Sequence, residues 1–344
     1  MKVTKRLLSK LPSCYSVVTA PLRDGMYALF ASEADDVCLA FDLSDPGRMR
    51  TIWEHPGGTM GMVPIPGRSG EFLAIQKFYR LWDWEESELV WVRETEDRFE
   101  TFPILRLPYL HRFDILEAGG WLYLLVCGVA AHKSSLQDWS CPGVVLGGVL
   151  PKGPEEALRM ETLRSDFYRN HGYARVVLNG IERGFVTCAN GGFLFTPPQT
   201  AEDSWSVEKL LDGDFSDGDM ADIDGDGEME IVAISPFHGN KYSIYKQIGG
   251  VWAEVYIHPE RAGFYHVATA GKLCGRMGFL GGGREGRQSL FFVSSPGAGQ
   301  PFELLEIDRG QGPSNARIWN TPAADYVLAA NRNVGEAVLY RIEP

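Results

Sequence analysis

The stretch DGDMADIDGDGEMEIVAIS, residues 217–235, joins an acidic, glycine-rich run directly to a short apolar segment. That segment, Glu230-Ile-Val-Ala-Ile, has the length and composition of a buried β-strand. Similar segments recur roughly every 45–60 residues, a period typical of propeller blades. Together with Glu230-Ile-Val-Ala-Ile there are seven such segments. The other six are Tyr27-Ala-Leu-Phe, Phe72-Leu-Ala-Ile, Leu122-Tyr-Leu-Leu-Val, Gly184-Phe-Val-Thr-Cys, Met277-Gly-Phe-Leu and Tyr326-Val-Leu-Ala-Ala.

A second recurring segment alternates apolar and charged residues, as in Trp205-Ser-Val-Glu-Lys-Leu-Leu, and indicates an outer strand with one wet face. The seventh copy lacks this strand, and Val3-Thr-Lys-Arg-Leu-Leu near the start of the chain resembles it. We therefore predict an all-β fold, a seven-bladed β-propeller of four-stranded blades, closed by the N-terminal strand. A β-sandwich or two smaller β domains would leave the seventh unit unexplained. The expected blades are 14–57, 58–110, 111–169, 170–216, 217–263, 264–314, and 315–344 with 1–13.

The composition narrows the class of protein. A net charge of −12 argues against general nucleic-acid binding, which needs a cationic surface. The six cysteines show no CxxC spacing, so we expect reduced thiols and not a zinc cage or a disulfide framework. The N-terminal segment lacks the apolar core of a signal peptide, and no apolar run reaches transmembrane length. We expect a cytoplasmic protein.

The acidic run has the spacing of a calcium loop. Carboxylates stand at loop positions 1, 3, 5 and 9, and glycines stand where the backbone must turn. Ca²⁺ takes six to eight oxygen ligands, and this spacing wraps them around one point. We expect a structural calcium ion there; the alternative is an acidic turn without an ion. The candidate ligands are Asp222, Asp224, Asp226, Glu228 and Glu230.

Histidines recur at one structural position. His111, His171 and His266 lie at or near the start of a first strand, where the blades converge on the ring axis. Neutral imidazoles that meet there suit a transition metal such as Zn²⁺ or Mn²⁺, or acid–base catalysis. A single histidine at a strand start is more often a hydrogen-bonded turn residue. The repetition is what favours a site.

The same face carries basic side chains on an otherwise acidic protein. They stand in the loops between second and third strands and predict a small polar or anionic ligand, such as a carbohydrate. Ordinary solvated loop charge is the alternative. These residues are Lys77, Arg80, Lys241, Arg284, Arg287 and Arg332.

The acidic loop and its strand resemble the calcium loops of FG-GAP/VCBS-type propeller repeats. With Asn170-His171-Gly172-Tyr173, the chain also looks like the propeller domain of aldos-2-ulose dehydratase-type lyases. Those enzymes carry an additional cupin-like region that this sequence does not show.

This resemblance implies a metal-assisted lyase or dehydratase acting on a sugar or keto-sugar. In this hypothesis His111, His171 and His266 hold the axial metal. His238 or Tyr265 is the base, and Lys241 or Arg284 holds the substrate. A non-catalytic propeller that binds a glycan or a protein, and a metal-dependent hydrolase or epimerase, stay open. No serine-hydrolase elbow, Walker loop or dinucleotide fingerprint is evident.

Overall fold

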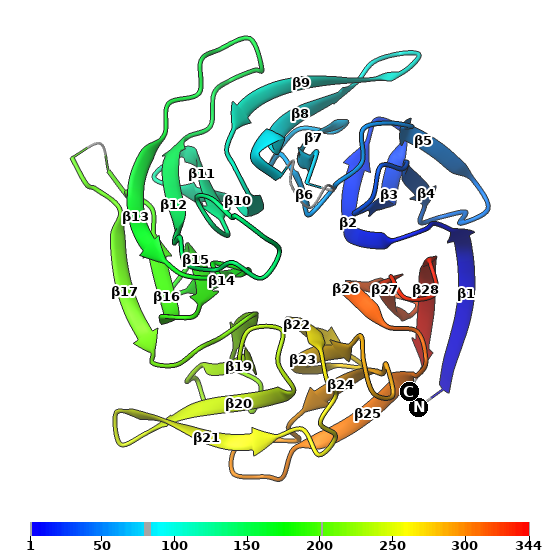
Figure 1. The fold of residues 1–344 in the computed structure, drawn as a ribbon. Helices are drawn as coiled ribbons and strands as arrows, with labels where there is room; N and C mark the ends of the chain where they lie inside the picture. The colour runs from blue at the N-terminus through cyan, green and yellow to red at the C-terminus, as the bar shows by residue number, and fades with distance from the viewer. Residues whose placement is uncertain (1, 79–83, 201, 344) are drawn as a thin grey trace.

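Antiparallel strands form seven four-stranded sheets that stand as blades around a central channel (Figure 1). The computed structural model describes residues 2–78, 84–200 and 202–343. Within these ranges the one helical element is the 3₁₀ turn η1, Trp84–Glu86. No helix in the described ranges has the length and apolar character needed to cross a membrane. The predicted all-β, seven-bladed fold is confirmed.

Each blade takes four strands in chain order from the channel outward. Blades 1 to 3 contain β2 Cys14–Leu22, β3 Gly25–Ser32, β4 Cys38–Asp42 and β5 Met49–Trp53; β6 Met62–Pro64, β7 Glu71–Gln76, β8 Glu88–Glu94 and β9 Phe99–Arg106; and β10 Leu110–Ala118, β11 Trp121–Gly128, β12 Gly143–Val149 and β13 Glu161–Phe167. Blades 4 and 5 contain β14 Gly172–Leu178, β15 Ile181–Cys188, β16 Gly191–Thr196 and β17 Ser206–Leu211; and β18 Gly218–Ala221, β19 Glu230–Ser235, β20 Lys241–Ile248 and β21 Val251–Ile257. Blades 6 and 7 contain β22 Tyr265–Leu273, β23 Arg276–Gly283, β24 Leu290–Ser294 and β25 Glu303–Asp308; and β26 Pro313–Asn320, β27 Asp325–Asn331 and β28 Glu336–Glu343, completed by β1 Lys2–Lys10.

The two ends of the chain close the ring. β1 pairs antiparallel with β28, from Lys2 opposite Glu343 to Lys10 opposite Glu336, and the termini lie side by side (Figure 1). The predicted closure by the N-terminal strand is confirmed. It covers the outer edge of β28, which would otherwise present unpaired backbone groups.

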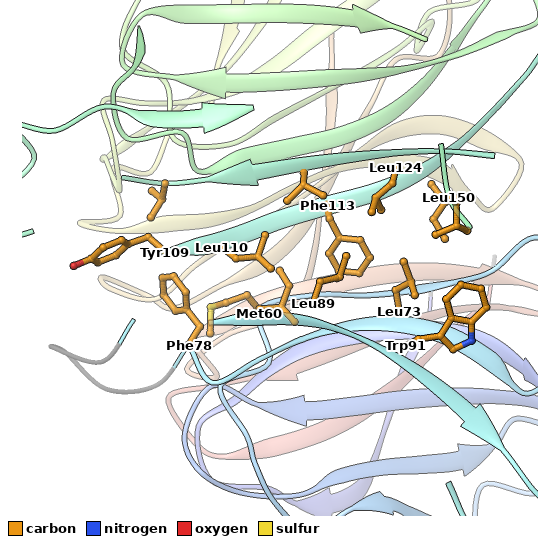
Figure 2. Close-up of a cluster of buried hydrophobic side chains, with 14 of the residues drawn as sticks. Met60, Leu73, Phe78, Leu89, Trp91, Tyr109, Leu110, Phe113, Leu124 and Leu150 are labelled. Carbon is orange, nitrogen blue, oxygen red and sulfur yellow. The ribbon is translucent and has the colours of Figure 1, made fainter. Parts of the chain in front are cut away.

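The hydrophobic core lies between the blades. Second strands such as β19 and third strands such as β4 are buried almost throughout, whereas the outer strand β21 is largely exposed or half-buried. Each pair of adjacent blades encloses its own cluster of buried side chains in the described part of the chain. Figure 2 shows the cluster between blades 2 and 3, where Trp91 and Leu73 face Phe113 and Leu124. This packing fixes the blades relative to one another, and thereby positions the loops around the channel.

Candidate functional site

A cavity of about 770 Å³ occupies the channel mouth formed by the loops that join second to third strands and neighbouring blades. Four histidines line it: His111, His171, His238 and His266. They come from blades 3, 4, 5 and 6, far apart in the sequence. The ring centroid of His171 lies 4.2 Å from that of His111, 4.7 Å from that of His238 and 5.4 Å from that of His266. The structure thus brings the three predicted axial histidines together and adds His238.

β-Bulges aim several of these side chains into the channel. In β2, β10, β22 and β26 the pairing register slips at the second residue of the strand. A bulge leaves the extra residue out of the ladder and re-aims its side chain. The four residues at these bulges are Tyr15, His111, His266 and Ser314. The repeated bulge explains why blades of different sequence place their side chains at one level of the channel.

Three of the histidines have the spacing of metal ligands. His171, His238 and His266 each offer a ring nitrogen, and these nitrogens lie within 4.8 Å of one another. His171 Nε2 is 3.2 Å from His238 Nε2. Two imidazole nitrogens about 2.0–2.1 Å from one tetrahedral zinc ion would stand about 3.3 Å apart. The donor atoms, and the separation of the His171 and His238 nitrogens, therefore fit a transition-metal ion.

Hydrogen bonds at Nδ1 orient the rings. His266 Nδ1 lies 2.6 Å from the Ser314 carbonyl oxygen, and His111 Nδ1 lies 3.2 Å from that of His171. A carbonyl only accepts, so both Nδ1 atoms donate and both Nε2 atoms keep their lone pairs. Metal-binding histidines are commonly fixed in this way. The Tyr15 hydroxyl lies 3.2 Å from His266 Nε2 and donates to it.

A buried carboxylate supports His171. Asp217, just before β18, places Oδ2 2.9 Å from His171 Nδ1, although the N–H is not aligned as a hydrogen bond, so the contact is chiefly electrostatic. Its Oδ1 lies 3.7 Å from Arg112. Burial alone would raise the pKa of Asp217, but His171 and Arg112 outweigh it and hold that pKa well below its usual range. Gly172 permits this approach, because a Cβ there would lie 2.6 Å from the Cα of Asp217.

Burial keeps the other histidines neutral. It lowers the pKa of His111, His238 and His266, and the neighbouring rings lower it further. Neutral imidazoles have the free lone pairs that metal binding or proton abstraction requires.

The cavity wall above the histidines is aromatic. Phe237 stacks on His238 with ring centroids 4.0 Å apart, and Phe264 lies 4.4 Å from the same ring. Trp139 meets Phe237 edge-on at 4.9 Å. It comes from the loop between β11 and β12, which reaches toward the ring centre (Figure 1). His238 has a φ of 48°, a region that costs a non-glycine residue about 1–2 kcal/mol, so the aromatic packing holds a strained position.

Arg284 differs from the other predicted rim cations. It lines the cavity, as Arg332 does, but its Nε is buried without a hydrogen-bond partner, and its guanidinium lies 4.8 Å from the centre of the Phe264 ring. Burial lowers its pKa. Lys77, Lys241, Arg287 and Arg332 pair with Glu88, Glu254, Glu260 and Glu33, while Arg80 lies outside the described residues.

Two of the predicted catalytic residues lie elsewhere. The Tyr265 hydroxyl is held in the core between blades 5 and 6 by His258 Nδ1, 2.9 Å away, and by the Glu260 carbonyl. Lys241 Nζ lies 2.5 Å from Glu254 on the neighbouring strand. Neither is among the described residues that line the cavity. Residues along a strand alternate in direction, and the bulge at His266 directs Tyr265 into the core between the blades.

Sequence reasoning missed Tyr15 and Arg112. Tyr15 occupies the bulge position of blade 1 that His111 and His266 occupy in blades 3 and 6, so aligning the repeats at the strand start would have found it. The part that Arg112 plays in the site becomes evident only from its contact with Asp217 in the structure.

Comparisons with known proteins show the fold alone. No protein-family model matches the chain, and no curated protein matches it. Among solved structures, virginiamycin B lyase from Staphylococcus aureus is similar with a TM-score of 0.62 at 11% identity, over 99% of both chains. A streptogramin B lyase gives 0.59 at 13% identity, over 99% of this chain and 98% of the other. The β-propeller domain of Myceliophteria thermophila Cps50 (Swd1) gives 0.59 at 10% identity, over 99% of this chain and all of the other.

Proposed function

We propose that the protein is a metal-dependent carbon–oxygen lyase that acts on a small anionic sugar or keto-sugar in the channel cavity. The observation that carries the proposal is the group of ring nitrogens of His171, His238 and His266, which lie within 4.8 Å of one another. Two lyases share the fold at 11–13% identity, so the proposal depends on the site itself and not on that likeness.

A divalent transition metal at this group would polarise a carbonyl or carboxylate oxygen of the substrate. In the elimination, a base removes the proton α to that carbonyl, the electron pair forms a carbon–carbon double bond, and the β carbon–oxygen bond breaks. The departing oxygen takes a proton. No oxidant or reductant is needed.

The arrangement exchanges two roles expected from the sequence. His238 joins the ligand group with His171 and His266, while His111 becomes the base. His111 suits this role because its Nδ1 donates to the carbonyl of His171, so Nε2 keeps a lone pair. The Tyr15 hydroxyl, which also lines the cavity, is the proton donor for the departing oxygen.

Arg284 and the aromatic wall define the substrate class. A guanidinium with a buried, unpaired N–H can bind a carboxylate or phosphate through charge-assisted hydrogen bonds. Trp139 and Phe237 offer apolar ring faces to a sugar. A cavity of about 770 Å³ has room for a mono- or disaccharide.

Metal analysis and a turnover assay test the proposal together. Protein purified without a histidine tag should contain close to one equivalent of zinc or manganese. With oxidised sugars or uronates it should produce a conjugated enone, seen by ultraviolet absorbance. His171→Ala should remove both properties, while Tyr265→Phe should keep both. Absence of turnover with every metal across a broad panel would refute a lyase.

One observation favours a second candidate, a non-catalytic glycan-binding propeller. The histidine cluster can satisfy itself, because Tyr15 donates to His266 Nε2 and His238 Nε2 is within hydrogen-bond distance of His171 Nε2. This candidate predicts tag-free protein without bound transition metal that still binds sugars in the same cavity.

A further inference from the structure

The acidic loop between β18 and β19 already holds a cation that the chain supplies. Lys246 on β20 places Nζ 2.6 Å from Asp224 Oδ2, 2.7 Å from Asp226 Oδ2 and 2.6 Å from Glu230 Oε1. We propose that the Lys246 ammonium takes the position expected for calcium, so that blade 5 folds without a metal ion.

The donors and acceptors match one to one. An ammonium group has three N–H donors, and three oxygens from three carboxylates surround this one. The distances are those of charge-assisted hydrogen bonds. The lysine side chain is 19% exposed and that of Glu230 is fully buried, so the contact between these two is poorly screened by solvent.

The remaining carboxylate oxygens hold the turn itself. Each of these oxygens accepts a hydrogen bond from a backbone N–H of the loop: Asp226 donates to Asp224, Glu228 to Asp226 and Ile223 to Glu230. The two oxygens of Asp222 accept from the backbone N–H groups of Gly225 and Gly227. These five bonds are 2.7–3.3 Å long. Hydrogen bonds to its own backbone therefore fix the shape of the loop. The excess negative charge of its carboxylates needs a cationic partner.

Calcium and the lysine exclude each other. Ca²⁺ needs six to eight oxygens at about 2.3–2.6 Å, and it would have to draw on the oxygens that surround Nζ. Two cations cannot share that shell, so the ammonium would have to leave first. Burial alone would lower the pKa of Lys246, but the three carboxylates outweigh it and raise that pKa, so the lysine stays charged. Oxygens of Asp222, Asp224 and Asp226 lie within 4.8 Å of one another, but with the ammonium among the carboxylates these residues do not fit a calcium ion.

Thermal unfolding in the presence and absence of calcium tests the proposal. The wild-type protein should melt at the same temperature, within about 1 °C, in excess EGTA and in about 2 mM calcium, which exceeds the Kd of most protein calcium sites. Lys246→Met keeps most of the side-chain volume but removes the charge. It should melt several degrees lower in EGTA and recover on addition of calcium, because the freed carboxylates become ligands.

Three further variants complete the design. Lys209→Met is the matched control: the ion-pair partner of Lys209 on β17 among the described residues is the exposed Asp212, so the melting temperature of this variant should not depend on calcium. If Lys246→Met does not fold, that failure agrees with the proposal provided that Lys246→Arg, which keeps the charge, folds and ignores calcium. A wild-type melting temperature that rises with calcium, by an increment that Asp224→Asn abolishes, would overturn the proposal. The loop lies at the opposite end of the strands from the histidines, so neither result affects the lyase proposal.

Discussion

Replacing Asp217 by asparagine tests whether the histidine cluster is a metal site. Asp217 contacts the ring nitrogen of His171 that points away from the other histidines, and it does not line the cavity. Its role in the proposed function is to orient His171. Asparagine keeps the shape and removes the charge.

The expected magnitude follows from the two contacts. Loss of a carboxylate behind a metal-binding histidine typically lowers metal affinity by 10–100-fold, or about 1.4–2.7 kcal/mol. Arg112, whose side chain is 12% exposed, loses its ion-pair partner, and breaking a buried pair costs about 3–5 kcal/mol of stability. We expect the lower end of that range, because Arg112 Nη1 also reaches the carbonyls of Met60 and His111, both at 3.3 Å.

Zinc competition against a chromophoric chelator measures the affinity, and urea unfolding of the metal-free protein measures the stability. Asp219→Asn is the matched control, since Asp219 is also buried but accepts hydrogen bonds from the backbone of Met220 and Ala270. It should lose stability and keep its zinc affinity. If folded Asp217→Asn binds zinc within about twofold of the wild type, the assigned role of Asp217 is refuted.

Four other outcomes are expected. Arg284→Met should raise KM for anionic substrates at least tenfold with little change for neutral analogues, measured by steady-state kinetics; an equal effect on both would contradict charge recognition. Tyr15→Phe should tighten zinc binding, because it removes the hydrogen bond to His266 Nε2, while lowering kcat; calorimetry that shows weaker binding would contradict this. Trp91→Ala should cost about 3–5 kcal/mol in urea unfolding, since this ring is fully buried between blades 2 and 3, whereas Trp121→Ala, at a ring 55% exposed, should cost far less. Deleting residues 2–10 should leave β28 as an open edge and produce aggregation by light scattering; a monodisperse protein of unchanged melting temperature would argue against closure.

The fold could be predicted because its signal repeats. Each blade needs a buried second strand, so segments such as Glu230-Ile-Val-Ala-Ile recur at a nearly constant interval, and a missing outer strand is conspicuous. The closure by β1 followed from one local similarity with β17. Repetition also located His111, His171 and His266 at one level of the channel, since first strands converge there by geometry.

The roles within the site could not be predicted, because they depend on contacts between blades. A histidine at a bulge and a histidine in a loop look equivalent in sequence, but the loop brings His238 to 3.2 Å from His171. Tyr265 lies next to His266 and turns the opposite way, into the core between blades 5 and 6. Lys246 lies 16 residues beyond Glu230, on the next strand, and only the pairing of β19 with β20 carries it over the acidic loop.

The acidic loop and the histidine cluster differ in how their buried polar groups are satisfied. This difference indicates which of the two would bind a metal ion. In the acidic loop the negative charge is met by an ammonium that the chain itself holds, so an ion would have to displace a bonded partner from three oxygens. In the channel, burial keeps His111, His238 and His266 neutral, and the Nδ1 atoms of His111 and His266 are committed to backbone carbonyls. Among the described residues, His266 Nε2 has the Tyr15 hydroxyl as its hydrogen-bond partner, and the Nε2 atoms of His171 and His238 have each other. In the channel a metal ion exchanges two weak contacts for coordination bonds, whereas in the loop it must displace an ammonium from two hydrogen-bonded carboxylates and a third, ion-paired one. A preparation that binds calcium at the loop in preference to zinc at the histidines would show that this comparison is wrong.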